Sequence, residues 1–250
     1  MSAGRPSRRT IVGGGAALGA AFSLAVSGLL PPPAQAAPTD KRVEDALRRL
    51  RMRRNRVLTG TTSRNGWPME KVVDDRGNIY TRPVPGTPLD GVQLRMGDVE
   101  VVLVHLIRRY HYEVEELQVG DVIGWRAPRT VRRSSPQSDQ ASGTAVRIRP
   151  EHYPAGASGG FFPLQISVIR DVLAELDGVV RWGGDDPTPD EALFAIAVGP
   201  DDERLAAVAR RLRGWQDDPA RGAGTAVDVL APVRRRAAQA LAQRHQRTTS

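Results

Sequence analysis

Residues 138–147 read SDQASGTAVR, a polar segment that tightens at Ser142-Gly143 and runs directly into a strand. A loop that feeds a strand in this way can aim two side chains at one metal ion, one from the loop and one from the strand. Gln140 and Arg147 stand at those two positions. Neither suits zinc, which takes thiolate, imidazole or carboxylate ligands. The segment therefore predicts the shape of a metal site without its chemistry.

The bulk composition bounds the class of protein. The chain has 250 residues, which allows one large domain or two small ones. Hydrophobic residues make up 40% and aromatic residues only 5%, so we expect a mostly aliphatic core. The chain has no cysteine, which excludes disulfides, thiolate metal sites and cysteine nucleophiles.

The formal net charge of +8 fits two interpretations. One is attraction to an anionic polymer, and the other is a solvated surface rich in arginine. Aromatic residues do not interleave with the basic runs, so base stacking has no platform. We therefore expect no nucleic-acid partner.

Residues 1–36 are typical of an export signal. A basic end precedes an apolar run over 11–30, and Ala34-Gln35-Ala36 supplies a small-x-small cleavage site. Ser7-Arg8-Arg9-Thr10-Ile11 also resembles the twin-arginine signal, which exports folded proteins. An uncleaved membrane anchor is the alternative, although glycines in the run and the three prolines after it disfavour a spanning helix. We expect a secreted, extracytoplasmic protein with no stable membrane span after cleavage.

Residues 37–91 combine a helix with an irregular stretch rich in proline and glycine. The helix is expected over 40–57, with Val43, Leu47 and Leu50 on one stripe and arginines around them. Such a helix packs its stripe on its own domain or lies on a membrane surface. Within the irregular stretch the sequence predicts one short strand, at residues 79–82.

Residues 92–216 mix helices and strands without regular alternation, and residues 217–250 add an extended segment and a helix. We expect helices from Asp98, from Pro163 and over 202–215 and 232–245. The expected strands are 92–94, 122–125, 144–148, 179–182 and 191–198. This order favours the α+β class.

Several of these pieces keep one order and spacing. They are Gly143-x-Ala145, the strand turn at 179–184, and Asp190-Glu191-Ala192-Leu193-Phe194, preceded by Gly124-Trp125-Arg126-Ala127-Pro128. Together they resemble the zinc D-alanyl-D-alanine carboxypeptidase family, which includes the vancomycin-resistance dipeptidases, over about residues 92–215. The resemblance implies a small, central, mostly antiparallel sheet flanked by helices.

The resemblance also implies roles for individual positions. In that family a His, an Asp seven residues later and a second His bind zinc, an acid three residues before the second His is the general base, and an Arg steadies the substrate. The three ligand positions are here Gln140, Arg147 and Leu193. The base position is kept as Asp190 and the arginine position as Arg126. None of the zinc ligands remains, so we expect no zinc cofactor.

Three hypotheses follow. The first is an exported pseudoenzyme that binds peptidoglycan or a cell-wall peptide through the carboxylate-reading Arg126 and Arg147, with Gln140, Ser142 and Trp182 completing the site. The second is an active cell-wall metallopeptidase with displaced ligands. The third is a secreted, basic protein that binds polyanions or has a structural role. The sequence leaves the oligomeric state open.

The acids near the second motif allow two further interpretations. Asp185, Asp186, Asp190 and Glu191 could bind a hard cation or could be solvated turn residues. Asp190 and Arg147 could also pair with each other and fill the vacated site with a salt bridge.

Overall fold

The computed structural model describes residues 39–216, 218 and 221–249. The chain divides into two units, Met1–Val43 and Glu44–Ser250. In the first unit only residues 39–43 are described, and they begin helix α1 (Thr39–Val57). The predicted export signal and its cleavage site lie outside the described residues.

A four-stranded antiparallel sheet lies at the centre of the second unit. Its strand order is β5 (Val122–Ile123), β6 (Ala145–Ile148), β8 (Leu193–Ile196) and β7 (Val180–Trp182). Two antiparallel pairs accompany it: β1 (Leu58–Thr62) with β2 (Pro68–Glu70), and β3 (Ile79–Arg82) with β4 (Val92–Arg95). The predicted α+β class with small antiparallel sheets flanked by helices is therefore confirmed.

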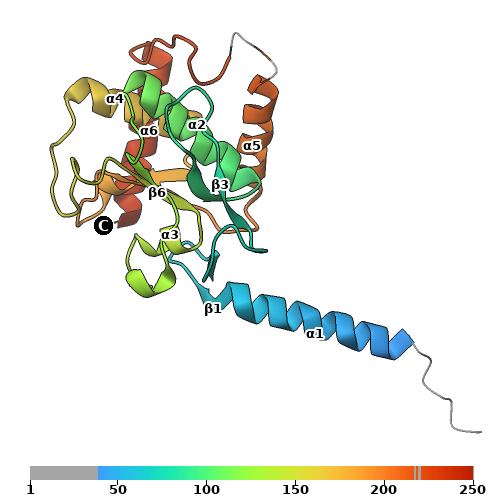
Figure 1. Cartoon of the computed structure of the whole chain (residues 1–250). Coiled ribbons are helices and arrows are strands. Elements are labelled where there is room, and N and C mark those ends of the chain that lie inside the picture. Colours follow the sequence, from blue (N-terminus) through green and yellow to red (C-terminus); the bar gives the residue numbers. More distant parts are fainter. Residues whose placement is uncertain (1–38, 217, 219–220, 250) are drawn as a thin grey trace, which may run out of the picture. The chain divides into compact units, whose positions relative to one another are not determined.

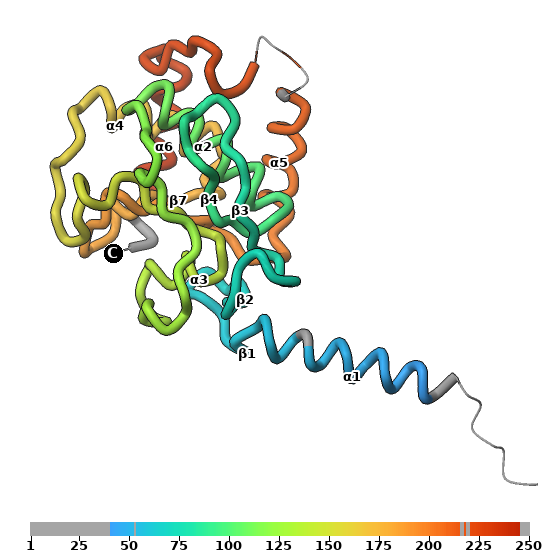
Figure 2. Tube along the Cα trace, in the orientation of Figure 1, coloured from blue at the N-terminus to red at the C-terminus, as the bar shows by residue number. Residues whose placement is uncertain are grey.

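Four long helices belong to the same unit as this sheet. They are α2 (Asp98–Glu113), α4 (Pro163–Glu175), α5 (Glu203–Gln216) and α6 (Pro232–Thr249). Helix α2 packs against α4 and α5, and α4 packs against α6. In Figure 1, α2, α4 and α6 lie above β6, whereas the short helix α3 (Ser138–Ala141) lies below it. Figure 2 follows the chain through β3, β4 and β7 in the same view.

The two faces of the central sheet have different neighbours. Val146 and Phe194 belong to the main hydrophobic core, together with residues of the long helices. Side chains alternate along a strand, so the residues between them point to the other face. There Ala145, Leu193 and Ala195 form a separate small apolar cluster.

Two arginines share the face of this small cluster. Arg147 stands opposite Leu193 in the β6–β8 register, and Arg181 stands opposite Ala195 in the β7–β8 register. Directly opposed side chains on neighbouring strands lie on the same side of a sheet. We call the side carrying Arg147 and Arg181 the polar face.

The polar face is covered by α3 and by the segment between β1 and β2. The backbone N–H of Arg64 donates to Ser138 Oγ at 3.0 Å, and the Asn65 side-chain amide donates to the Ile196 carbonyl at 2.9 Å. Segments distant in the sequence therefore close over the sheet. Strands on both sides of the predicted 91/92 boundary also share one pair, since β3 pairs with β4.

Most expected elements are present, with corrections at three places. The predicted strand 122–125 is shorter, because after Ile123 the chain turns to β4, where the Trp125 N–H donates to the Gln93 carbonyl at 2.9 Å. Strands β1 and β2 form within the stretch expected to be irregular. The polar loop expected at Ser138 is instead the helical turn α3, and its four residues are all buried.

The chain needs a glycine between α3 and β6. Gly143 has a φ of +69°, and a Cβ there would lie 2.9 Å from the backbone nitrogen of Arg95. Its carbonyl accepts a hydrogen bond from that same nitrogen at 2.9 Å. The tightening predicted at Ser142-Gly143 therefore brings α3 against β4.

Candidate functional site

The corner between α3 and β6 is a closed polar structure. The Asp139 carbonyl accepts hydrogen bonds from the Thr144 N–H at 3.0 Å and from Ser142 Oγ at 2.9 Å. Ser142 Oγ also lies 2.9 Å from Ser63 Oγ, and Ser142 is fully buried. Its hydroxyl therefore fixes the corner, and the structure does not support the predicted ligand contact for Ser142.

Gln140, at the position of the first family histidine, ties α3 to the edge of the sheet. Its Nε2 donates to the carbonyls of Ile123 and Gly124 at 3.1 and 2.8 Å. The residue is fully buried, and its Oε1 has no hydrogen-bond partner among the described residues. Because Ile123 stands opposite Arg147, Gln140 lies next to the second predicted position. Its burial excludes direct contact with a ligand in this conformation.

Arg147 and Asp190 form the salt bridge that the sequence suggested. Arg147 Nη2 lies 3.0 Å from Asp190 Oδ1, and Arg147 Nε lies 3.3 Å from the same oxygen. The other oxygen, Oδ2, accepts a hydrogen bond from Gln137 Nε2 at 3.1 Å. Asp190 is buried and both of its oxygens are engaged, so the interpretation as a solvated turn acid is wrong. A general base needs a lone pair facing its proton donor, and this carboxylate is committed elsewhere.

Leu193, at the position of the second family histidine, completes the group. It is fully buried and stands opposite Arg147. Arg147, Leu193 and Asp190 therefore lie together on the polar face, and Gln140 of α3 contacts the neighbouring strand β5. Among the described residues no group of three or more His, Cys, Asp or Glu side chains is placed to hold a metal. The amide, guanidinium and isobutyl groups at the three positions do not fit zinc.

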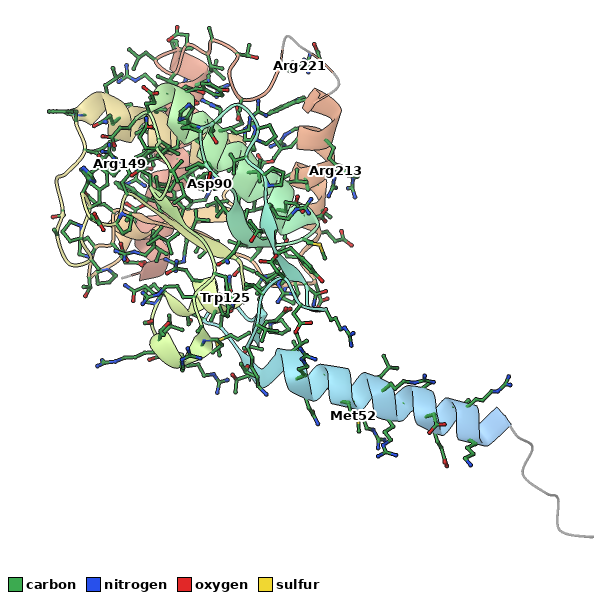
Figure 3. All side chains as sticks on the ribbon, viewed as in Figure 1. Met52, Asp90, Trp125, Arg149, Arg213 and Arg221 are labelled. Carbon is green, nitrogen blue, oxygen red and sulfur yellow. The ribbon has the colours of Figure 1, made fainter. Side chains whose placement is uncertain are left out.

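Arg126 lies in the segment after β5. The neighbouring Trp125, labelled in Figure 3, donates its indole N–H to the Glu70 carbonyl at 3.1 Å and so holds this segment against β2. Gly124 is tightly enclosed, since a Cβ there would lie 2.3 Å from the Gln93 carbonyl oxygen. Arg126 itself is half-buried, and no ion pair or hydrogen bond of its side chain occurs within the described ranges.

Trp182 is a core residue. It packs edge-to-face on Phe161 and stacks with Phe194, and its indole N–H donates to the Glu191 carbonyl at 2.8 Å. The structure therefore does not support the predicted substrate contact for Trp182. The Glu191 carboxylate is likewise engaged, because it accepts the backbone N–H groups of Gly159 and Gly160.

The pair formed by Asp139 and Arg181 was not predicted from the sequence. Arg181 reaches Asp139 Oδ2 at 3.2 Å and Asp186 Oδ2 at 3.0 Å, and the Asn65 N–H donates to Asp139 Oδ1 at 3.1 Å. Burial raises the pKa of Asp139, and the charge of Arg181 opposes that rise. The strand register was needed to find this pair, since it places Arg181 on the same face of the sheet as Arg147.

A cleft of about 650 Å³ opens beside Asp190. Its wall includes Arg64, Arg132, Gln137 and Asp186 besides Asp190, with serine, proline and threonine between them. Arg64 Nη1 lies only loosely, at 3.8 Å, from Asp186. Arg132 is exposed and forms no ion pair or hydrogen bond through its side chain with the rest of the described chain. The carboxylates of the cleft are therefore compensated, while one cation is left over.

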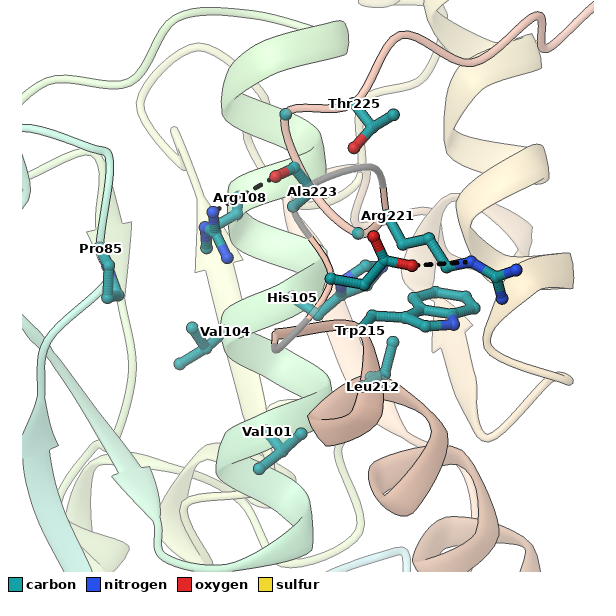
Figure 4. Close-up of a pocket in the computed structure, with 13 residues that line it drawn as sticks. Pro85, Val101, Val104, His105, Arg108, Leu212, Trp215, Arg221, Ala223 and Thr225 are labelled. Atoms are coloured by element: carbon teal, nitrogen blue, oxygen red, sulfur yellow. Dashed lines mark hydrogen bonds and ion pairs between the residues drawn. The ribbon is translucent and has the colours of Figure 1, made fainter.

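A second cavity of about 530 Å³ lies between α2, α5 and residues 221–225. Figure 4 shows its lining by His105 and Trp215, with Arg108 reaching the Ala223 carbonyl at 3.3 Å. His105 Nε2 is engaged with Glu175 Oε1 at 2.8 Å. None of the sequence motifs borders this cavity.

No family model, curated protein or solved structure matches the chain. Among the described residues no helix is sufficiently long and apolar to span a bilayer, and the apolar run at 11–30 lies outside them.

Proposed function

We propose that this chain is an exported, non-catalytic binding protein that holds a carboxylate-bearing cell-wall peptide in the cleft beside Asp190. The observation that carries the proposal is the Arg147–Asp190 pair, of which Asp190 lines that cleft. In the resembled family these two positions hold a zinc ligand and the general base. Here they neutralise each other.

The charges of the cleft support a carboxylate as ligand. Asp186 binds Arg181 and Asp190 binds Arg147, so neither acid repels an incoming anion strongly. Arg132 at the wall has no ion pair within the described part of the chain, and its planar guanidinium matches carboxylate geometry. A peptide ending in D-alanine presents such a group at its C-terminus.

The same contacts argue against turnover. Peptide hydrolysis of the resembled kind needs a metal-activated water and a free base. Asp190 is bound through both oxygens, and a guanidinium cannot release its proton to become a metal ligand. We therefore expect binding without release of D-alanine.

The matched pair Arg132→Ala and Arg129→Ala tests this function. Both arginines are exposed, but only Arg132 lines the cleft. For a fluorescent peptide ending in D-Ala-D-Ala, Arg132→Ala should weaken binding roughly 10- to 100-fold, since a charge-assisted hydrogen bond contributes about 1.5–3 kcal/mol. Arg129→Ala should bind as the unsubstituted protein does. Equal losses in both variants would indicate nonspecific attraction and contradict a site in the cleft.

Arg126→Ala tests a second carboxylate contact, which would lie outside the residues that line the cleft. The side chain makes no internal ion pair in the described structure, so its removal should leave the fold intact. We expect weaker retention on purified cell wall in a pull-down. Unchanged retention would remove Arg126 from the site, and release of D-alanine in the same assay would favour the active-peptidase hypothesis.

A further inference from the structure

The apolar stripe of α1 is not packed on the rest of the second unit. Leu47 and Leu50 keep 47% and 60% of their surface exposed. The helix joins its unit only near its C-terminal end, where Val57 is buried and Lys71 Nζ donates to the Asn55 carbonyl at 2.7 Å. Of the two interpretations of this stripe, packing on its own domain is therefore wrong for Leu47 and Leu50.

The charge around the stripe is strongly positive. The helix carries eight Lys and Arg residues against three acids, and no acid follows Asp45. Arg56 is bound to Asp75, but Arg48, Arg51 and Arg54 form no ion pair with the described part of the chain. The exposed leucines are thus surrounded by uncompensated cations.

The exposed leucines and the uncompensated arginines together indicate which kind of partner α1 binds. A second copy of α1 would cover the leucines but would bring two strongly basic helices side by side. A soluble polyanion would neutralise the arginines but would leave Leu47 and Leu50 in water. An anionic lipid surface accommodates both, because acyl chains receive the leucines while headgroups bind the arginines.

We propose that α1 docks on an anionic lipid bilayer, with Leu47 and Leu50 at the acyl boundary and the flanking arginines among the headgroups. This surface is separate from the cleft and does not depend on the proposed peptide binding. The long arginine side chains can extend their charged ends toward the headgroups while their stems line the apolar stripe.

The absence of cysteine allows a test with one probe at a time on the full chain. Leu50→Cys carries an environment-sensitive nitrobenzoxadiazole label on the stripe. Met52→Cys carries the same label on the control face, because two residues rotate the position by about 200°. Met52, labelled in Figure 3, is also apolar and 58% exposed, so the two substitutions are matched. Circular dichroism confirms that each labelled chain stays folded.

On vesicles of phosphatidylglycerol and phosphatidylethanolamine, we expect the label at position 50 to shift to the blue. Nitroxide lipids should quench it, while the label at 52 stays water-like. On phosphatidylcholine vesicles both labels should stay water-like, which separates the effect from any insertion of residues 11–30. Equal responses at 50 and 52 would overturn the proposal. A blue shift at 50 with soluble polyphosphate and none with vesicles would overturn it in favour of a polyanion partner.

Discussion

Two partly buried clusters of polar and charged side chains occupy opposite sides of the central sheet. The helix cluster joins α2, α4 and α6 and consists of Arg109, Glu113, Asp171, Glu175 and Arg234. The sheet cluster lies on the polar face and consists of Gln137, Asp139, Arg147, Arg181 and Asp190. The sheet cluster pairs two arginines with two acids, whereas the helix cluster holds two arginines and three acids. Among the described residues, only the sheet cluster adjoins the cleft in which Arg132 forms no ion pair. We infer that the first cluster holds helices together and that the second also shapes a binding surface.

The largest expected effect falls on the helix cluster. Arg109 is 1% exposed and binds Glu113, Asp171 and Glu175. Arg109→Met leaves the buried Asp171 and the partly buried Glu113 and Glu175 without this partner. It should lower the free energy of unfolding by about 3–5 kcal/mol, measured by urea denaturation. The control Arg204→Met breaks only the exposed pair with Asp202 and should change it by less than about 1 kcal/mol. Similar losses in both variants would contradict a structural role specific to the helix cluster.

Acid should weaken the same cluster through Glu175. Burial alone would raise the pKa of Glu175, but the hydrogen bond with His105, the charge of Arg109 and the hydrogen bond from Arg234 outweigh it and lower the pKa to about 2. Because the pKa of Glu175 is lower in the folded than in the unfolded chain, its carboxylate stabilises the fold at pH values above the unfolded pKa of about 4.3. That stabilisation is lost as the pH falls toward 2. We expect a loss on the order of 3 kcal/mol over that window.

The variant Glu175→Gln isolates this contribution. It should be less stable at pH 7 and should show a flatter decline of unfolding free energy between about pH 4.5 and 2. If the variant and the unsubstituted protein decline in parallel, Glu175 is not the group that causes the loss.

A smaller effect is expected in the sheet cluster. Arg147→Met removes the cation from Asp190 and leaves only the Gln137 hydrogen bond. We expect a loss of about 2 kcal/mol, because part of the guanidinium already reaches solvent and the carboxylate keeps one donor. Thermal unfolding would measure it, with Arg129→Met as the exposed control. No loss in Arg147→Met would show that the pair does not stabilise the polar face.

Much of the fold could be predicted from local pattern. Helical spacing and terminal signals indicated the long helices, and Ser142-Gly143 indicated the turn into β6. The remaining errors in the predicted elements could be corrected only from contacts between segments that are distant in the sequence. Ser138–Ala141 is a buried helix and not a surface loop, because the segment around Asn65 closes over it.

The candidate site also combines features that the sequence predicted with features that only the structure revealed. The spacing of the two sequence motifs identified Arg147 and Asp190 as site residues, and in the structure they form a salt bridge. The roles of Ser142 and Trp182 could not be corrected from sequence, because they depend on tertiary contacts. Ser142 is bound by the distant Ser63, and Trp182 is buried in the hydrophobic core. The sequence also could not show that Arg132 lacks an ion pair within the described chain, because this depends on which acids pair with other arginines.

We propose that the cleft beside the sheet cluster recognises a carboxylate without cleaving the peptide. Calorimetric titration of the unsubstituted protein with a peptide ending in D-Ala-D-Ala, and with the same peptide as its C-terminal amide, tests this most directly. We predict that the acid binds at least about tenfold more tightly than the amide, because only the acid pairs with an arginine fork. We also predict that both peptides are recovered intact. Equal affinity for acid and amide would contradict carboxylate recognition, and release of D-alanine from the acid would contradict binding without cleavage.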